Sequence, residues 1–363
     1  MSSVEIIEDI ASAFIQSDNK KIISILEGEI EKRKKMGQNI VSRRLRNLLS
    51  KIPDKKAYSF QSVKNDHQIY SSKNESLVEY IESKILLEEV VLDIENQKKI
   101  KNFLIEWENR IKLSDFGISP TNKLLIYGPP GTGKTKLAYG LANKLNLPLV
   151  LVRLDELISS YLGKTGKNIK DIFDIAKKQE VLIFLDEIDT IAKDRADEKE
   201  LGELKRIVTV LLQNIDSFPQ NSIIIGATNH EGLLDTAIWR RFPLRISLGV
   251  PSKPARKQLI KLFIDKFRHK LDFELLADLT EGLSGSAISD IVIHMKKRAI
   301  LEKIEIIDNT FALKNILDFS SKPLIEKKQS YKVCQLLKDK GYSIKEISDI
   351  TSMPYTTLRD NIK

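Results

Sequence analysis

The chain of 363 residues has few of the features on which several protein classes depend. Its one cysteine, Cys334, cannot form an internal disulfide, which excludes a disulfide-stabilised scaffold and favours a reducing compartment. The longest apolar runs, such as Val181–Leu185 and Ile223–Ala227, are far below the roughly 18 residues that span a bilayer. The few histidines are scattered without the spacing of metal ligands, so no structural metal is expected: His67, His230, His269 and His294.

Charged residues, in contrast, are abundant. They make up 30 % of the chain, and 59 Lys and Arg against 50 Asp and Glu give a net charge of +9. With 42 % hydrophobic residues, this composition indicates a folded, helix-rich protein of two or three domains. The first residues are acidic (Glu5, Glu8, Asp9) and show no secretory pattern, so we expect a cytoplasmic protein.

Hydrophobic patterning divides the chain into five parts. Short apolar runs alternate with helical segments over 86–250, which predicts an α/β domain with a parallel sheet. After Pro251 the strands are expected to stop, giving a helical subdomain over 251–320. We expect a small all-α module at each end, over 1–60 and 321–363, and a linker over 61–85.

A glycine-rich segment between a predicted strand and a predicted helix matches the pattern G-x-x-x-x-G-K-[ST]. Glycines let backbone N–H groups surround phosphate oxygens, and the helix N-terminus attracts the same negative charge. Lys134 should neutralise the β- and γ-phosphates, and the Thr135 hydroxyl should bind Mg²⁺. The predicted nucleotide-binding residues are Gly128, Pro129, Pro130, Gly131, Thr132, Gly133, Lys134, Thr135 and Lys136.

Two carboxylates follow the apolar run Val181–Leu185. Asp186 is predicted to lie near hydrated Mg²⁺, so that the expected metal residues are Thr135 and Asp186. Glu187 is then placed to orient or deprotonate an attacking water. A strand that ends in Asp-Glu is by itself a common surface turn, but downstream of a phosphate-binding loop it predicts hydrolysis of a nucleoside triphosphate.

With these two motifs in place, the stretch from about Leu86 to Lys303 resembles the AAA ATPase family. Within that family it resembles the group of microtubule-severing and ESCRT-disassembling enzymes. The segment from Gly226 to Asn229 resembles sensor 1, and the resemblance implies that the Asn229 amide holds the attacking water or the γ-phosphate. Leu234–Phe242 resembles the second region of homology, which implies that Arg240 and Arg241 are arginine fingers acting on the neighbouring subunit.

The resemblance extends to a turn in the helical subdomain. Gly282–Ala287 resembles the sensor-2 turn, which implies that Gly285 and Ser286 help to bind the nucleotide and that the subdomain is a lid over the adenine. Ala287 stands where other ATPase groups carry arginine, and the group that this chain resembles lacks that arginine too. The resemblance also implies ATP as the nucleotide and a homo-oligomeric ring, usually a hexamer.

A short aromatic segment indicates what such a ring acts on. Tyr161, Leu162 and Gly163 stand where AAA unfoldases carry a pore loop, whose aromatic residue grips an extended polypeptide. Tyr161 could instead pack against its own domain. The charged segment Lys193–Leu204 stands where the resemblance would place a second pore loop. We therefore expect a protein client in preference to loading on DNA.

The C-terminal residues predict a helix-turn-helix. Ile347, Ile350, Met353 and Leu358 would form its core, with Tyr331–Lys340 as the preceding helix. A recognition helix beginning near Pro354 would present Tyr355, Thr356, Arg359 and Lys363 to DNA. A small helical module that binds protein is the alternative, because Ser352 occupies the turn position where glycine is usual.

The N-terminal residues are basic over Glu31–Lys56. They resemble the N-terminal region of some small bacterial AAA ATPases, including ones encoded beside a subtilisin-like protease, although a solvated helix surface would look the same. We thus expect a Mg·ATP-hydrolysing ring that remodels or unfolds a protein partner. Two alternatives remain open: a DNA-associated regulatory ATPase, and a regulatory subunit that controls a protease or toxin.

Overall fold

The structure, a computed structural model, describes residues 78–155, 165–192, 198–320, 327–351 and 353–362, apart from the side chains of 191–205 and 319–332. All of these residues belong to one compact unit, Gln68–Lys363. The expected N-terminal module over 1–60 and most of the expected linker lie outside the described residues.

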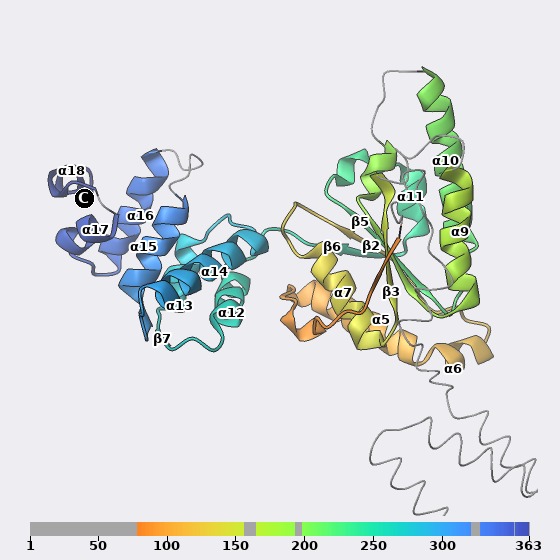
Figure 1. Ribbon diagram of the computed structural model, residues 1–363, viewed down its shortest axis with the longest axis horizontal. Coiled ribbons are helices and arrows are strands. Elements are labelled where there is room, and N and C mark those ends of the chain that lie inside the picture. The colour runs from red at the N-terminus through yellow and green to blue at the C-terminus, as the bar shows by residue number, and fades with distance from the viewer. Residues whose placement is uncertain (1–77, 156–164, 193–197, 321–326, 352, 363) are drawn as a thin grey trace, which may run out of the picture. The chain divides into compact units, whose positions relative to one another are not determined.

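A six-stranded sheet forms the first half of the described chain, with strand order β1-β3-β4-β5-β2-β6 (Figure 1). Its pairs are parallel, except that β1 runs antiparallel to β3. The strands are β1 (Val78–Ile81), β2 (Lys123–Tyr127), β3 (Leu149–Arg153), β4 (Leu182–Asp186), β5 (Ile223–Thr228) and β6 (Leu244–Ser247). The predicted α/β class with a mainly parallel sheet is confirmed.

Helices cover both faces of this sheet, α5 and α7 on one and α9 and α10 on the other (Figure 1). Leu124 and Ile126 of β2 pack in one cluster with Leu137 and Leu141 of α7, while Leu125 between them is buried as well. Central strands buried on both faces explain the continuous apolar runs in the sequence. The helices are α5 (Ile94–Glu108), α6 (Arg110–Asp115), α7 (Lys134–Leu145), α9 (Thr165–Lys178), α10 (Glu198–Asp216) and α11 (Thr236–Arg241). Short 3₁₀ turns are η1 (Leu87–Glu89), η2 (Ile188–Ala192) and η3 (Glu231–Leu233).

Two strands differ from the sequence-based expectation. β1 lies inside the segment 61–85 that we expected to be a linker, so the sheet begins before residue 86. Val78 and Tyr80 are buried on either side of exposed Glu79, and Ile81 is partly buried, so the alternation is too short to predict a strand. Strands also do not stop at Pro251, because β7 (His269–Lys270) pairs in parallel with β8 (Ile307–Asp308).

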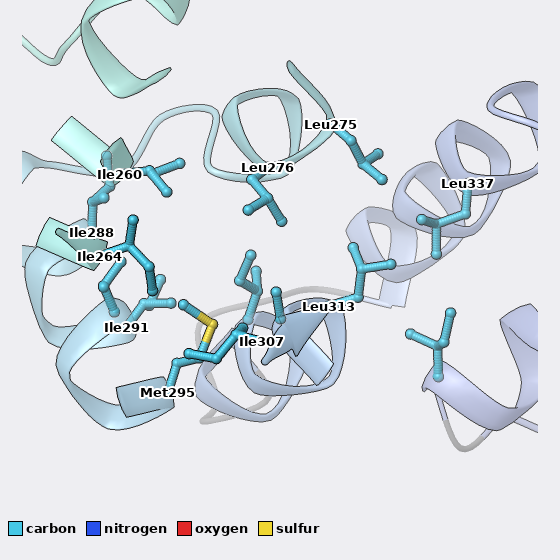
Figure 2. Close-up of a cluster of buried hydrophobic side chains, with 14 of the residues drawn as sticks. Ile260, Ile264, Leu275, Leu276, Ile288, Ile291, Met295, Ile307, Leu313 and Leu337 are labelled. Carbon is cyan, nitrogen blue, oxygen red and sulfur yellow. The ribbon is translucent and has the colours of Figure 1, made fainter. Parts of the chain in front are cut away.

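The second half is helical around its own apolar core. Figure 2 shows side chains of α12, α13 and α14, among them Ile260, Leu276 and Ile291, converging on one cluster. Leu313 of α15 joins the same cluster. The helices are α12 (Lys253–Ile264), α13 (Phe273–Leu279), α14 (Gly285–Leu301) and α15 (Asn309–Ser320).

Three C-terminal helices follow: α16 (Lys327–Asp339), α17 (Ile344–Thr351) and α18 (Tyr355–Asn361). As expected, Ile347, Ile350 and Leu358 are buried, and Met353 is partly buried. These side chains are continuous with the cluster of α12–α15, so the C-terminal helices share a core with the preceding subdomain. Such short helices bury too little apolar surface to be stable by themselves. Among the described helices, none is both long and apolar enough to cross a membrane.

Candidate functional site

Three segments that the sequence singled out meet at one edge of the sheet. β4, β5 and β2 are parallel neighbours, so their carboxyl ends lie side by side. Tyr127, the residue before the glycine-rich loop, pairs with Thr228, the residue before Asn229. Asp186 ends β4 on the other side of β5. Parallel pairing thus brings together the loop 128–135, the Asp186–Glu187 pair and Asn229, which are far apart in the sequence.

The loop between β2 and α7 depends on its glycines. Gly128, Gly131 and Gly133 all have positive φ angles, of 140°, 74° and 101°. A Cβ atom at Gly128 would lie 2.0 Å from the Leu248 carbonyl oxygen, and one at Gly131 would lie 2.2 Å from Ser286 Oγ. Gly128 therefore excludes other residues both by conformation and by space, whereas Gly131 and Gly133 are favoured mainly by their positive φ angles. Gly133 is the N-cap residue of α7, so the loop leads directly into a helix N-terminus.

Lys134 begins α7 and is almost fully buried. Its ammonium group donates hydrogen bonds to the carbonyl oxygens of Gly128 (2.7 Å) and Pro129 (2.8 Å), so the side chain folds back over its own loop. Burial lowers the pKa of Lys134, and the negative charges of Asp186 and Asp189 oppose this shift. A desolvated cation at a helix N-terminus is suited to a phosphate group.

The other loop residues lie around Lys134. The Thr132 hydroxyl donates a hydrogen bond to the Pro129 carbonyl (2.9 Å), and Thr135 is exposed. Lys136 lies 3.7 Å from a Glu89 carboxylate oxygen and 5.8 Å from the centre of the Phe263 ring. Lys136 therefore links α7 both to the η1 turn and to α12.

Asp186 and Glu187 occupy a bend at the end of β4. Burial raises the pKa of Asp186, while the hydrogen bond from the Glu187 backbone N–H (3.0 Å) and the charge of Lys134 lower it. Glu187 is exposed and has a positive φ of 50°, a strained conformation for a residue with a side chain. The Thr190 backbone N–H and hydroxyl both donate to the Glu187 carbonyl, at 2.9 and 2.8 Å, and hold this bend.

The groups at this edge fit a magnesium–nucleotide complex. The glycine loop leads into the N-terminus of α7, and Lys134 supplies a positive charge whose described hydrogen bonds go to loop carbonyls. The Thr135 hydroxyl and the Asp186 carboxylate are hard oxygen ligands of the kind that Mg²⁺ prefers.

Two buried polar residues behind the edge were missed by the sequence analysis. Asp189 of η2 is 3 % exposed, and its carboxylate accepts a hydrogen bond from the Thr228 hydroxyl, 2.7 Å away. Thr228 is 1 % exposed and accepts from the His230 backbone N–H at 2.9 Å. The sequence did hold one signal for Asp189: it is a third carboxylate that lies between the apolar residues Ile188 and Ile191. Apolar residues on both sides are unusual for a solvent-exposed turn and favour a buried position.

The two arginines predicted as fingers differ in their surroundings. Arg241 donates to a carboxylate oxygen of Asp216 (2.8 Å) and to the Ala237 carbonyl (2.9 Å), so its guanidinium is bound within its own chain. Arg240, the preceding residue of α11, is exposed. The helix begins at Asp235, whose side chain caps the Ala237 N–H, and this bond holds the pKa of Asp235 below its usual value.

An aromatic contact joins α11 to the strand that precedes the glycine loop. The Trp239 ring meets the Tyr127 ring edge-on, with centroids 5.2 Å apart. The Arg245 guanidinium lies 5.3 Å from the centre of the same Trp239 ring and donates to the Trp239 carbonyl. Trp239 thus holds α11 against β2 and β6, next to the start of the loop.

The turn before α14 contacts the glycine loop. The Ser286 backbone N–H donates to the Gly131 carbonyl at 2.9 Å, and a Cβ at Gly285 would lie 3.4 Å from the same oxygen. Ser284 caps α14 by accepting from the Ala287 N–H, and its hydroxyl lies 3.0 Å from that of Ser286. Gly285 and Ser286, predicted from the sequence, are therefore beside the loop.

Other predicted residues are not part of this edge as described. Tyr161, Leu162, Gly163 and the first part of Lys193–Leu204 lie outside the described residues, as does Lys363. On α18, Tyr355 and Thr356 are exposed, and Arg359 forms an ion pair with Asp360 at 3.1 Å.

Comparisons with known proteins agree with the arrangement of the site. Residues 124–250 match the family described as "ATPase family associated with various cellular activities (AAA)". An uncharacterized AAA family ATPase of Sinorhizobium fredii, y4kL, is 31 % identical over 280 residues, which cover 77 % of this chain and 84 % of that protein.

Further relatives match a shorter region. A proteasome-activating nucleotidase of Archaeoglobus fulgidus is 37 % identical over 213 residues, 55 % of this chain and 54 % of that protein. A putative 26S proteasome regulatory subunit homolog of Methanothermobacter thermautotrophicus is 38 % identical over 193 residues, 52 % of either protein. The chain thus spans about half of the length of these two relatives.

Proposed function

Because the chain belongs to the AAA family of ATPases, we propose that it works as an oligomeric ring, which hydrolyses Mg·ATP to remodel or unfold a protein partner. The observation that carries this proposal is the convergence of the glycine loop, Asp186 with Glu187, and Asn229 at the carboxyl edge of three parallel strands. Ligands of open α/β sheets bind at this edge.

Within one subunit, we propose that the loop residues and Lys134 hold the phosphates of ATP. Thr135 and Asp186 would hold Mg²⁺, which neutralises charge on the β- and γ-phosphates. Glu187, exposed on its bend, orients or deprotonates the attacking water, and Asn229 holds that water or the γ-phosphate. Gly285 and Ser286 bring the helical lid against the loop, consistent with the contact to Gly131.

Between subunits, we propose that Arg240 stabilises charge on the phosphates bound by the neighbour. Its exposure at the end of α11 supports this role, since a guanidinium must leave its own chain to act in trans. Arg241 would first have to leave Asp216, and we therefore assign it the secondary part in the pair of fingers.

The protein client rests on two indications. The segment Tyr161–Gly163 has the aromatic–hydrophobic–glycine form of a pore loop. Relatives carry names that refer to proteasome activation and regulation, and by analogy a protease is a reasonable partner here. The expected hexamer, the cytoplasmic location and the identity of the client belong to the same proposal.

A test of the function uses a variant that binds ATP without hydrolysing it. Glu187→Gln should keep nucleotide affinity, lose at least about 100-fold in turnover and retain its partners. Pulldown of this variant with Mg·ATP, followed by identification of bound protein and DNA, should yield a protein client that the Lys134→Ala variant does not retain. Wild-type turnover by Glu187→Gln would contradict the assignment of the base.

Subunit mixing tests the ring. A Lys134→Ala subunit cannot bind nucleotide but still has Arg240. An Arg240→Ala subunit still has the nucleotide-binding loop but lacks the arginine finger. If sites are completed in trans, mixing the two inactive variants should restore a fraction of the ATPase activity. No recovery at any ratio, with assembly verified by light scattering, would contradict the role of Arg240 in trans.

DNA binding is the second candidate, because α16–α18 have the predicted helix-turn-helix order and α18 exposes Tyr355 and Thr356. Arg359→Ala together with Lys363→Ala should then weaken binding to duplex DNA and reduce its salt dependence. Lys297→Ala, at an exposed position of α14, serves as the control for general charge. Equal DNA affinity in all variants would favour the protein-binding alternative for these helices.

A further inference from the structure

The η2 turn, behind the nucleotide edge, forms hydrogen bonds to Glu187 and to Thr228, the residue before Asn229. Thr190 of this turn donates two hydrogen bonds to the Glu187 carbonyl. Asp189, its neighbour in the same turn, accepts from the Thr228 hydroxyl, and Thr228 directly precedes Asn229. One short turn is therefore bonded on one side to the residue proposed as base and on the other side to Thr228, the neighbour of the residue proposed as sensor.

Thr228 also closes a small ring around Asn229. Its hydroxyl oxygen accepts a hydrogen bond from the His230 backbone N–H at 2.9 Å, while the same hydroxyl donates to the Asp189 carboxylate at 2.7 Å. A side-chain oxygen that accepts from the N–H two residues on is a local turn that restricts the residue in between. Asn229 is that residue, so the orientation of the Thr228 hydroxyl helps to hold its backbone, together with the bond from the Gly128 N–H to the Thr228 carbonyl at 3.3 Å.

Burying Asp189 and Thr228 costs free energy, because both side chains lose hydrogen bonds to water. A carboxylate that is 3 % exposed loses most of its hydration, and an uncompensated charge of this kind destabilises the fold. Lys134 provides part of the compensation, since its charge interacts with that of Asp189. A charged acceptor also makes a shorter and stronger hydrogen bond than a neutral one, which orients the hydroxyl more tightly.

We propose that Asp189 and Thr228 are positioning residues: their hydrogen bond sets the spacing between Glu187 and Asn229 and so makes the attacking water reactive. The inference rests on the proposed roles of Glu187 and Asn229. Neither Asp189 nor Thr228 touches the nucleotide in this scheme. Misplacement of a catalytic group by about 1 Å can cost roughly 100-fold in rate, so the bond affects turnover much more than nucleotide affinity.

The test compares three variants of the full chain. Thr228→Val removes the hydroxyl at nearly constant volume, Thr228→Ser keeps it, and Asp189→Asn keeps an acceptor without the charge. We expect kcat to fall at least about tenfold in Thr228→Val, with KM and the affinity for a fluorescent nucleotide within about twofold. Thr228→Ser should recover most of the rate, and Asp189→Asn should lie between the two.

A second measurement does not depend on turnover. Hydrogen exchange of the His230 amide should be faster in Thr228→Val than in the wild type, and slow again in Thr228→Ser. Wild-type kcat in Thr228→Val, or equal losses in Thr228→Val and Thr228→Ser, would overturn the proposal. If Glu187→Gln retains full turnover while exchange at His230 still follows the hydroxyl, the proposed base is wrong but the Thr228 ring around Asn229 stands.

Discussion

The nucleotide edge of the sheet and the helical half of the described chain bury polar groups in different ways. In the sheet half, buried Lys134, Asp189 and Thr228 come from separate elements and face other functional groups at one edge. In the helical half, buried Arg256 donates to the carbonyls of Ala277 and Pro251, both at 2.9 Å. Lys134 also satisfies backbone acceptors, but its charge interacts with those of Asp186 and Asp189, whereas the contacts described for Arg256 are with backbone carbonyls.

This difference separates buried polar residues that stabilise the fold from those that belong to the nucleotide site. A polar group that satisfies a helix end stabilises the fold, as the buried Thr280 hydroxyl does on the Leu276 carbonyl at 2.8 Å. Desolvated charges that face each other shift one another's pKa and typically mark functional sites. Substitutions in the sheet edge should therefore alter activity first, and substitutions in the helical core should alter stability first.

The largest effect is expected for Lys134→Ala. Loss of the buried ammonium should abolish nucleotide binding and reduce ATP hydrolysis by at least about 100-fold, because Lys136 is directed instead toward Glu89 and Phe263. Lys144→Ala is the matched control, since Lys144 lies at the other end of α7 and pairs with Glu88. Titration with a fluorescent nucleotide measures the affinity of both variants. Equal affinities would contradict the assignment of Lys134 to the nucleotide site.

Leu276→Ala tests the opposite half. Leu276 is 1 % exposed in the helical core, so its truncation should lower the free energy of unfolding by about 2–5 kcal/mol. At a temperature where the variant is folded, its ATPase rate should stay close to that of the wild type. Leu301→Ala, at a side chain that is 80 % exposed, should change stability by less than about 0.5 kcal/mol. Urea unfolding with an unchanged m-value provides the measurement. An equal loss in both would contradict the assigned core.

A smaller loss of stability is expected at the start of α13. The Asp272 side chain accepts from the backbone N–H groups of Glu274 (2.9 Å) and Leu275 (3.1 Å). Asp272→Ala should lower the free energy of unfolding by about 1 kcal/mol, whereas Asp272→Asn, which can still cap, should stay near the wild type. Thermal unfolding distinguishes them, and an Asn variant as weak as the Ala variant would show that capping is not the cause.

The smallest effect concerns Tyr80 on β1, a polar group buried away from the nucleotide edge. Burial raises the pKa of the Tyr80 phenol to about 12. Because the folded-state pKa lies above the unfolded value near 10, its stability contribution is complete below about pH 10 and is lost as pH rises toward 12. Spectrophotometric titration should show a late-ionising tyrosine that disappears in Tyr80→Phe. An unchanged titration curve would mean that Tyr80 is not shielded.

Much of the sheet could be predicted from the sequence because its strands are buried on both faces. The runs around Leu124, Ile183 and Ile225 are apolar without alternation, and the first two are each followed by helical spacing. The loop 128–135 was recognisable for a related reason: its glycine positions are required by backbone conformation, which acts locally.

Other features could not be predicted, because the forces behind them act between distant segments. β1 is a strand only because β3 offers it an unpaired edge. The C-terminal helices were expected to form a separate module, but Cys334, Leu337 and Leu358 bury against the helices before them. Amphipathic spacing shows which face of a helix is apolar and does not show what covers it.

By itself, the sequence determined the class of fold, the phosphate-binding loop and the two carboxylates after β4, since these depend on local periodicity and on backbone conformation. Only the tertiary structure decided that Arg241 is bound to Asp216 while Arg240 is exposed, and that Asp189 holds Thr228. Neighbouring arginines look alike in a sequence, and so do a buried and a solvated aspartate. Their chemistry differs because strand order sets which partners and how much water each one meets.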